Sequence, residues 1–331
     1  MGRAQGELAH LGRDRHDPQR DPVGDRGQGR ALVDRRRGGG PRLLTPPSFL
    51  GVVKEAPAAY ADAAVVVVPV PYERTVSYGG GTARGPAAIL EASAYVELYD
   101  EVLGEEPWQK GIHTAPEVTP MDDPEAFLAR LEERAREVFT DGKFPVFLGG
   151  EHGLTTAPVR AAREAFEGLS VLQLDAHADL RQEYMGTPWS HASVMRRIHD
   201  LGVPAVPIGI RAVSPEEMRF IRAHDLPVFW SHRIAYGDEW IDTALSALTD
   251  TVYLTFDVDF FDPSLVPATG TPEPGGGFWH DTMRFLGYVF QEKRVVGMDV
   301  VELAPIEGLH APDFVVARLV YRTIGYHLHD W

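Results

Sequence analysis

A regular alternation of short apolar runs with segments of helical periodicity is the feature that most constrains this chain of 331 residues. From residue 64 onward, apolar runs of strand length are followed by stretches in which apolar residues recur every three or four positions. Strands joined by helices in this way run parallel, because each helix carries the chain back to the same edge of the sheet. The pattern predicts an α/β fold with a mainly parallel central sheet and helices on both faces.

The positions of the expected elements follow from these runs. Strands are predicted at 64–70, 144–148, 169–174, 205–210, 228–230, 252–256 and 295–300. Helices are predicted at 86–94, 124–140, from about 154, at 191–201, 215–224, 238–248 and 280–291, and from 313. The helix at 124–140 is the clearest, because Asp123 can cap it, Pro124 suits its first turn and Gly142 can end it. No linker or internal repeat is evident, so residues 45–331 are expected to form one domain.

The first 44 residues differ in composition from the rest of the chain. They hold ten arginines, no lysine and six acidic residues, with many glycines and prolines and no apolar period. Such a segment cannot bury enough apolar surface to fold, so residues 1–44 are expected to be a disordered, solvated tail. A basic arm that contacts acidic partners is the alternative. Because the segment has no apolar central region, it does not read as a secretory signal, and the expected location is the cytoplasm.

The charge and composition of the other residues exclude several classes of protein. They carry 22 basic and 42 acidic side chains, so nucleic acid is an unfavourable partner, whereas small cations and metal ions are favoured. No apolar run approaches the roughly 18 residues of a membrane span. The chain has no cysteine, which excludes a disulfide scaffold, a thiolate metal site and a thiol nucleophile.

Charged and imidazole side chains follow four of the predicted strands at the point where each strand ends. His152 follows one strand, the sequence DAHAD at 175–179 a second, DVD at 257–259 a third, and Glu302 a fourth. Ligands of open α/β sheets bind at the carboxyl ends of the strands, so these groups are expected to converge. A purely structural role would leave many charges beside apolar strands without partners, which is costly.

The spacing within these motifs suits metal ions. In extended chain, residues at positions i, i+2 and i+4 point to one side, so the three polar residues of DAHAD can converge on one ion, and the two aspartates of DVD repeat the device. The candidate ligands are His152, Asp175, His177, Asp179, Asp257 and Asp259. Four carboxylates would balance two divalent cations, and oxygen-rich ligands without thiolate favour manganese, or another hard to borderline ion, over structural zinc. Such a pair of ions can activate water for hydrolysis.

Taken together, the motifs resemble those of the ureohydrolase family, the manganese hydrolases that include arginase and agmatinase. The matching segments are VPYERTVSYGGGTARGPAAIL at 70–90, GGEH at 149–152, DAHAD at 175–179, SHASVMRR at 190–197, DVDFFDPSLVPATGTPEPGG at 257–276 and MDVVELAP at 298–305. The resemblance implies a three-layer α/β/α sandwich, with residues 45–331 as the catalytic domain. It also implies a homo-oligomer, either a trimer or a hexamer.

The resemblance further implies a role for each residue of the site. One of two manganese ions would be held by His152, Asp175, Asp179 and Asp257, and the other by His177, Asp175, Asp257 and Asp259. Asp259 would pass a proton to the leaving nitrogen, His191 would be a mobile proton shuttle, and Glu302 would pair with the guanidinium group of the substrate. Asp299, close to Glu302 in the sequence, is expected to brace a ligand or the loop.

The expected substrate is agmatine, hydrolysed to putrescine and urea. The arginase motif resembles DxHxDxN, but Arg181 stands here in the place of the asparagine, and Ala212 and Ser214 stand where an arginase-like loop carries acids. The sequence DAHADLRQEYMGTPWSHASVMRR looks most like bacterial agmatinases, and an acidic protein attracts a dication. Arg181 is expected to face away from the site or to pair with Glu183, and residues 76–78 are expected at the pocket rim.

Three alternatives remain open. The substrate could be another guanidino compound, namely guanidinobutyrate, guanidinopropionate or arginine. A metal-binding protein without catalysis could act as a structural or regulatory partner, although such proteins usually lose a ligand, the shuttle or the guanidinium carboxylate, and all are present here. A polyamine deacetylase has a related fold, but it uses one zinc ion and lacks the second pair of aspartates.

Overall fold

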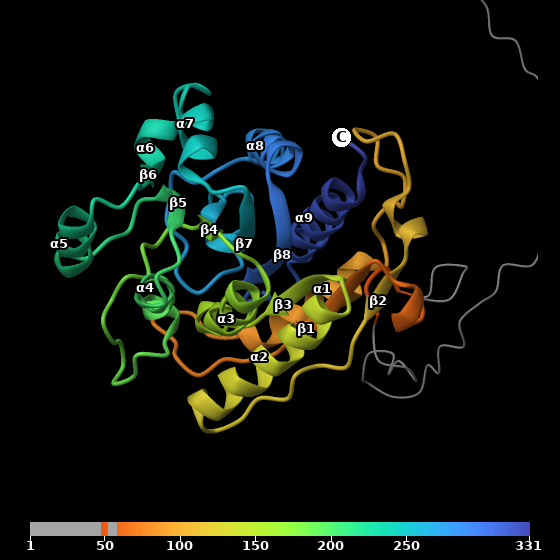
Figure 1. Cartoon of the computed structure of the whole chain (residues 1–331), viewed down its shortest axis with the longest axis horizontal. Helices are drawn as coiled ribbons and strands as arrows, with labels where there is room; N and C mark the ends of the chain where they lie inside the picture. The colour runs from red at the N-terminus through yellow and green to blue at the C-terminus, as the bar shows by residue number, and fades with distance from the viewer. Residues whose placement is uncertain (1–47, 52–57) are drawn as a thin grey trace, which may run out of the picture. The chain divides into compact units, whose positions relative to one another are not determined.

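One sheet of eight parallel strands forms the centre of the protein (Figure 1). The computed structural model describes residues 48–51 and 58–331. The strands are β1 (Val65–Val70), β2 (Ile112–Thr114), β3 (Phe144–Gly149), β4 (Leu169–Leu174), β5 (Ala205–Ile210), β6 (Phe229–Trp230), β7 (Thr251–Asp257) and β8 (Arg294–Val301). Their order across the sheet is β2-β1-β3-β8-β7-β4-β5-β6. The carboxyl ends of β3, β8, β7 and β4 therefore lie next to one another in the middle of the sheet.

Helices connect the strands. They are α1 (Gly85–Ser93), α2 (Pro124–Thr140), α3 (Thr156–Ala165), α4 (Val194–Asp200), α5 (Pro215–His224), α6 (Ser231–Ile234), α7 (Trp240–Ala247), α8 (Trp279–Glu292) and α9 (Ala311–Leu328). Short 3-10 turns follow β3 and β7, namely η4 (His152–Thr155) and η6 (Val258–Phe260), and another, η5 (His191–Ser193), directly precedes α4. Within the described part of the chain, no helix is both long and apolar enough to cross a membrane.

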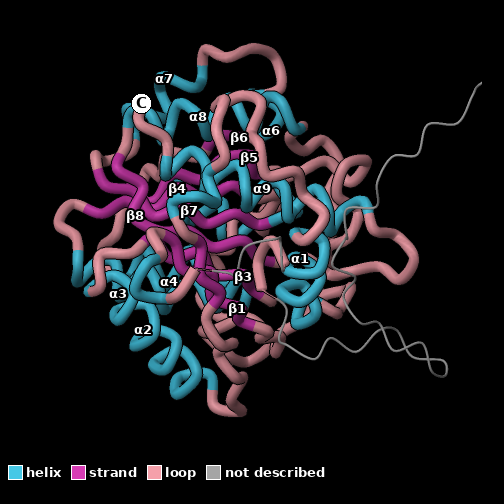
Figure 2. The backbone as a smooth tube through the Cα atoms, turned by 90° about the vertical axis from the view of Figure 1, so that its right-hand side faces the viewer, coloured by secondary structure: helices cyan, strands magenta, loops and turns pink. Residues whose placement is uncertain are grey.

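The helices cover both faces of the sheet because the strands are apolar on both sides. Along β1, Val65 and Val67 belong to one buried cluster, whereas Val66 and Val68 belong to another. The first cluster also contains side chains of α1, α7, α8 and α9, and the second contains side chains of α2, α3, α4 and α5. Figure 2 shows the strands between helices on either side. The predicted three-layer α/β/α sandwich is thus confirmed.

Local signals set the ends of two helices at the predicted residues. At the start of α2, the Asp123 carboxylate accepts a hydrogen bond of 3.1 Å from the Glu125 N–H, and Pro124 occupies the first turn. At the start of α5, Ser214 and Glu217 form a reciprocal capping box. Both helices need only residues close in sequence to define where they begin.

The prediction differs from the structure at the edge of the sheet. It omits β2, in which only Ile112 is apolar, because a three-residue strand is too short to show a period. Pairing with β1 creates this strand: Val65 lies opposite Ile112 in parallel register. The short helix α6 is also missing from the prediction. The predicted tail at residues 1–44 lies outside the described residues, which belong to one compact unit.

Candidate metal centre and active site

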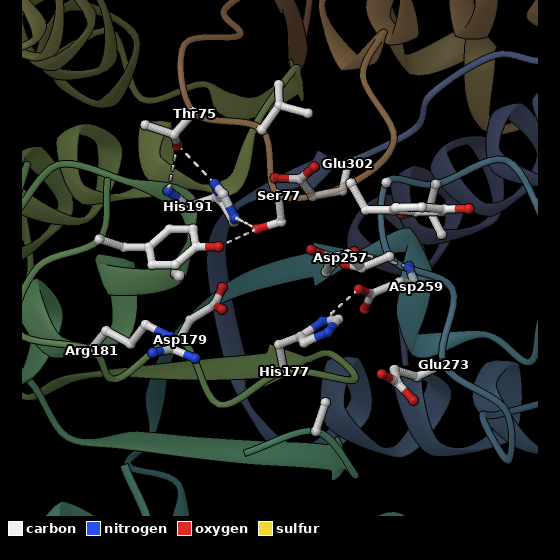
Figure 3. A pocket seen from close by; sticks show the side chains of 18 of the residues that line it. Thr75, Ser77, His177, Asp179, Arg181, His191, Asp257, Asp259, Glu273 and Glu302 are labelled. Carbon is white, nitrogen blue, oxygen red and sulfur yellow. Dashed lines mark hydrogen bonds and ion pairs between the residues drawn. The ribbon is translucent and has the colours of Figure 1, made fainter. Parts of the chain in front are cut away.

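A pocket of about 340 Å³ opens where β4, β7 and β8 end (Figure 3). The predicted site residues that line it are His177, Asp179, His191, Asp257, Asp259 and Glu302. His152 and Asp175 are fully buried beside them. The rim includes residues 76–78, where they were expected. Residues from separate strand ends therefore meet at a single place.

The first group of potential metal ligands surrounds His152. Its Nδ1 atom lies 2.9 Å from Asp179 Oδ2, 3.2 Å from Asp175 Oδ2 and 3.6 Å from Asp257 Oδ2. Among the described residues, this buried nitrogen has no partner with hydrogen-bond geometry. A buried nitrogen that faces three carboxylates without a hydrogen bond is expensive, unless the groups share a cation.

The second group surrounds His177. Its Nδ1 atom lies 2.8 Å from Asp259 Oδ2 and 3.8 Å from Asp175 Oδ1. Within each group, the ligand atoms of one histidine and two aspartates lie within 4.8 Å of one another. Asp175 belongs to both groups, which is the arrangement that a bridging ligand requires. The set of donors fits two adjacent divalent ions.

The pKa shifts of the candidate ligands also favour bound cations. Burial, together with the charges of Asp179 and Asp259, raises the pKa of Asp175 to about 7. Burial also raises the pKa of Asp257 well above its usual range. For His177, burial lowers the pKa, but Asp259 opposes this effect and the pKa rises to about 10. Carboxylates that resist ionisation beside an imidazole that retains its proton indicate a site short of positive charge, which metal ions would supply.

The backbone at the strand ends explains why particular residue types occur in the motifs. A Cβ atom at Gly150 would lie 1.9 Å from the Tyr72 carbonyl oxygen, so no side chain fits there. Asp179 and Glu302 have φ angles of 50° and 66°, in the left-handed region that residues other than glycine rarely adopt. These conformations turn the chain where β4 and β8 end, and both side chains line the pocket.

Glu302 is held in the pocket by the segment that follows β3. The His152 N–H donates a hydrogen bond of 2.6 Å to Glu302 Oε1, and the Glu302 N–H donates to the Gly150 carbonyl at 2.8 Å. Burial raises the pKa of Glu302 well above its usual range. A cation placed against this carboxylate would offset the cost of its ionisation.

His191 lies between two hydroxyl groups at the pocket rim. Its Nδ1 is 2.7 Å from Thr75 Oγ1, and its Nε2 is 2.9 Å from Ser77 Oγ. Ser77 Oγ in turn donates to the Tyr184 hydroxyl at 3.2 Å (Figure 3). Burial lowers the pKa of His191, so the ring is neutral near pH 7 and can accept a proton.

Sequence reasoning missed several residues that support the ligands. Thr255 Oγ1 lies 2.8 Å from His152 Nε2 and donates to Asp299 Oδ1 at 2.6 Å, so Asp299 braces a ligand residue through Thr255. Gln173 Nε2 donates to Asp175 Oδ2 at 2.8 Å. In the sequence, the one sign of a role for Thr255 and Gln173 is that each is a polar residue within an otherwise apolar strand.

Glu151, within the GGEH motif, also received no role. Its carboxylate accepts a hydrogen bond of 2.6 Å from the Arg74 N–H and one of 3.2 Å from Thr75 Oγ1. Burial raises the pKa of Glu151 to about 7. These contacts fix the loop that carries Thr75 and Ser77, and so they determine the position of His191.

Arg181 lines the pocket, and the expectation that it faces away or pairs with Glu183 was wrong. Its guanidinium carbon lies 5.2 Å from the centroid of the Tyr184 ring, and no ion pair with Glu183 occurs in the described part of the chain. Stacking on an aromatic ring holds the cation at the wall without a carboxylate partner. Ala212 and Ser214, which replace acids in the arginase-like loop, line the same pocket.

Comparisons with known proteins agree with this geometry. The model of the arginase family matches residues 63–325. The N(1)-aminopropylagmatine ureohydrolase of Synechocystis sp. is 45% identical, and the match covers 85% of this chain and 94% of the relative. The agmatinase of Pyrococcus horikoshii is 34% identical, with coverage of 80% and 92%. The crystal structure of agmatine ureohydrolase of Thermoplasma volcanium superposes with a TM-score of 0.77 at 29% identity, covering 86% of this chain and 95% of that chain.

The family match spans all eight strands and includes every candidate ligand, His191 and Glu302. The resemblance expected from the motifs is confirmed. The chain therefore belongs to the arginase family and is a hydrolase of the ureohydrolase type.

Proposed function

We propose that this protein hydrolyses the guanidinium group of an amine-bearing alkylguanidine to urea and a polyamine, with N1-aminopropylagmatine as the preferred substrate. One observation carries the reaction: two groups of histidine and aspartate ligands share a pocket with Glu302 and His191. The substrate is supported by the 45% identity to the Synechocystis relative of that name. Agmatine, the expectation from the sequence, is the second candidate, supported by the agmatinase that is 34% identical.

The ions proposed for the two ligand groups are Mn²⁺. The donors are carboxylate oxygens and two imidazoles, a set that suits hard to borderline divalent ions and includes no thiolate. When bound, the two ions supply a water acidic enough to act as a nucleophile near neutral pH. The chain itself contributes the binding of the guanidinium and the movement of protons.

Glu302 is proposed to bind the guanidinium. The His152 N–H occupies Oε1, so the carboxylate is held in one orientation while its side chain faces the pocket. A guanidinium offers paired N–H donors that match a carboxylate, and its charge favours the ionised acid. The planar guanidinium carbon is thereby placed beside Asp257 and Asp259, which lie next to Glu302 in the pocket (Figure 3).

The reaction forms a bond between the water oxygen and the guanidinium carbon and breaks the bond from that carbon to the alkyl-bearing nitrogen. The leaving nitrogen needs a proton, and Asp259 is the carboxylate proposed to carry it from the attacking water. A hydrogen bond of 2.9 Å from the Ala176 N–H holds Asp259 in place. His191 would exchange protons between the pocket and solvent along Ser77 and Tyr184.

A panel of guanidines tests this proposal. Urea release by the manganese-loaded protein is measured with N1-aminopropylagmatine, agmatine, arginine and 4-guanidinobutyrate. We expect kcat/KM to be highest for N1-aminopropylagmatine, followed by agmatine. For the two substrates with a carboxylate, kcat/KM should be at least about tenfold lower than for agmatine. Faster turnover of arginine or 4-guanidinobutyrate would overturn the substrate assignment. Stoichiometric manganese binding without urea from any guanidine would favour a non-catalytic protein.

Replacing the shuttle separates catalysis from metal binding. We expect His191→Asn to lower kcat by roughly a hundredfold, because proton transfer by a positioned imidazole contributes about that much. Manganese content, measured by elemental analysis, should stay at two ions per chain. His280→Asn is the matched control, since His280 is exposed on α8. An unaltered kcat in His191→Asn would contradict the shuttle role.

A further inference from the structure

One carboxylate of the pocket has no function in the reaction described so far. The acidic residues that line the pocket are Asp179, Glu217, Asp257, Asp259, Glu273 and Glu302. The three aspartates are candidate metal ligands, and Glu302 binds the guanidinium. Glu217 is occupied by the protein itself, since its two oxygens accept hydrogen bonds from the Leu180 N–H at 3.0 Å and the Ser214 N–H at 2.8 Å.

Glu273 differs from the other five, because its carboxylate forms no hydrogen bond or ion pair with any residue that the structure describes. The side chain is half-buried, so it is not a freely solvated surface acid. It also lies outside both groups of potential metal ligands. We infer that Glu273 is the subsite for an ammonium group in the amine tail of the substrate. This inference rests on the proposed function and names the residue that selects its substrate class.

The main chain at Glu273 is held firmly, so the carboxylate is presented in a defined place. Arg211 Nη2 donates to the Glu273 carbonyl at 2.8 Å and to the Asp259 carbonyl at 2.6 Å. One guanidinium thus ties Glu273 to the turn that carries a catalytic aspartate. The flanking residues Pro272 and Pro274 restrict the backbone further. A fixed carboxylate loses little freedom when it binds a cation.

The charges around the pocket set the direction of the substrate chain. In Figure 3, Glu302 and Glu273 lie on opposite sides of Asp259, so a guanidinium at Glu302 leaves the alkyl chain to extend toward Glu273. Arg181 lies across His177 from Glu273 in the same view. An ammonium group would be repelled by Arg181 and attracted by Glu273, which forms a charge-assisted hydrogen bond with it. Neutral and carboxylate-bearing tails lack this attraction.

The isosteric variant Glu273→Gln tests the subsite by a ratio of activities. We measure kcat/KM for agmatine, N1-aminopropylagmatine and 1-butylguanidine, whose tail carries no charge. Loss of the charged contact should lower the ratio of each amine-bearing substrate to 1-butylguanidine by about tenfold or more, mainly through KM. A ratio within about twofold of the wild type would overturn the inference. Because both activities come from one sample, partial misfolding does not alter the ratio.

A matched control and a binding measurement complete the test. Glu292→Gln changes an exposed glutamate at the end of α8, just before β8 begins, whereas the pocket lies where β8 ends. This variant should leave the ratio unchanged. If the wild type releases no urea from any guanidine, the proposed function fails. Calorimetry with spermidine then decides the inference by itself: weaker binding to Glu273→Gln than to the wild type and Glu292→Gln supports the subsite, and equal binding overturns it.

Discussion

The two ring nitrogens of His152 have different surroundings, and the difference selects the atom that faces the other candidate metal ligands. The Thr255 hydroxyl donates its hydrogen to Asp299, so it accepts one from His152 Nε2. The other Asp299 oxygen accepts from the Tyr253 hydroxyl at 2.9 Å, which completes the network. With Nε2 protonated, Nδ1 keeps its lone pair for an ion. Supporting residues of this kind fix both the tautomer and the orientation of a ligand.

Removal of this support should weaken metal binding. We expect Thr255→Val, which keeps the side-chain shape, to lower manganese affinity by roughly tenfold to a hundredfold, because the His152 ring loses its fixed partner. Calorimetric titration of the metal-free protein measures the change. Thr251→Val, in the same strand but at its opposite end, should bind manganese like the wild type. Equal affinity in Thr255→Val would show that the carboxylates alone orient His152.

At the level of elements, the site depends on helices that hold the central strands in place. The longest helix, α9, packs against the sheet next to β3, and its His327 ring stacks on Phe144 at a centroid distance of 3.8 Å and an angle of 17°. Burial, with a smaller effect of Lys110, lowers the pKa of His327 to about 4. The neutral ring therefore serves as an apolar packing surface between α9 and the strand whose end carries His152.

This contact predicts a pH dependence of stability. The pKa of His327 is lower in the folded protein than the ordinary value of 6.5, so its contribution is fully present above pH 6.5 and declines as the pH falls toward 4. Between pH 7 and pH 5 the loss should be about 1–2 kcal/mol. Urea unfolding of the wild type and His327→Phe at both pH values tests it. The variant should lose less stability over this interval, and equal losses would contradict the prediction.

Over the whole molecule, acidic groups outnumber basic ones by 16, and six acidic residues line the pocket. Folding buries Asp175 and Asp257 beside Asp259, which raises the pKa of both, whereas His177 lowers the pKa of Asp259 to about 2 against the effect of burial. Metal ions bind the folded state and not the dispersed ligands of the unfolded chain, so they should shift the folding equilibrium.

Metal removal should therefore lower thermal stability. We expect dialysis against a chelator to reduce Tm by several degrees, since a site held at a hundred times its Kd adds about 2.7 kcal/mol. Scanning calorimetry of the chelated and manganese-restored protein measures the shift. Restoration with two equivalents should recover Tm fully. A Tm that is indifferent to both treatments would contradict a metal centre linked to folding.

The assembly of the protein remains a prediction from the family resemblance. We expect light scattering to give a mass three or six times the 36.5 kDa of one chain. The measurement should be made with and without manganese, because metal-linked stability could alter association. A mass of a single chain at micromolar concentration would contradict the expectation of a trimer or hexamer.

The sequence by itself determined the fold class and which residues are the candidate ligands. Periodicity and caps act over a few residues, so α2 begins where Asp123 predicts and α5 covers the predicted residues 215–224. The motifs at 175–179 and 257–259 reach one pocket because parallel strands carry them to one edge of the sheet. The extended geometry expected within them was wrong, since Asp179 has a φ angle of 50° and residues 258–260 form η6. The residues of DAHAD are accordingly divided between the two groups, Asp179 with His152 and His177 with Asp259.

Other features of the protein depend on contacts between segments far apart in the sequence, and only the tertiary structure determines them. The strand β2 exists only through its pairing with β1. Thr255 gains its role because β7 lies next to β8, which supplies Asp299, and because the segment after β3 brings His152 to the Thr255 hydroxyl. Glu273 is set apart by the absence of an internal partner among the described residues. None of these relations has a local pattern, because each arises from the three-dimensional position of a residue far away in the sequence.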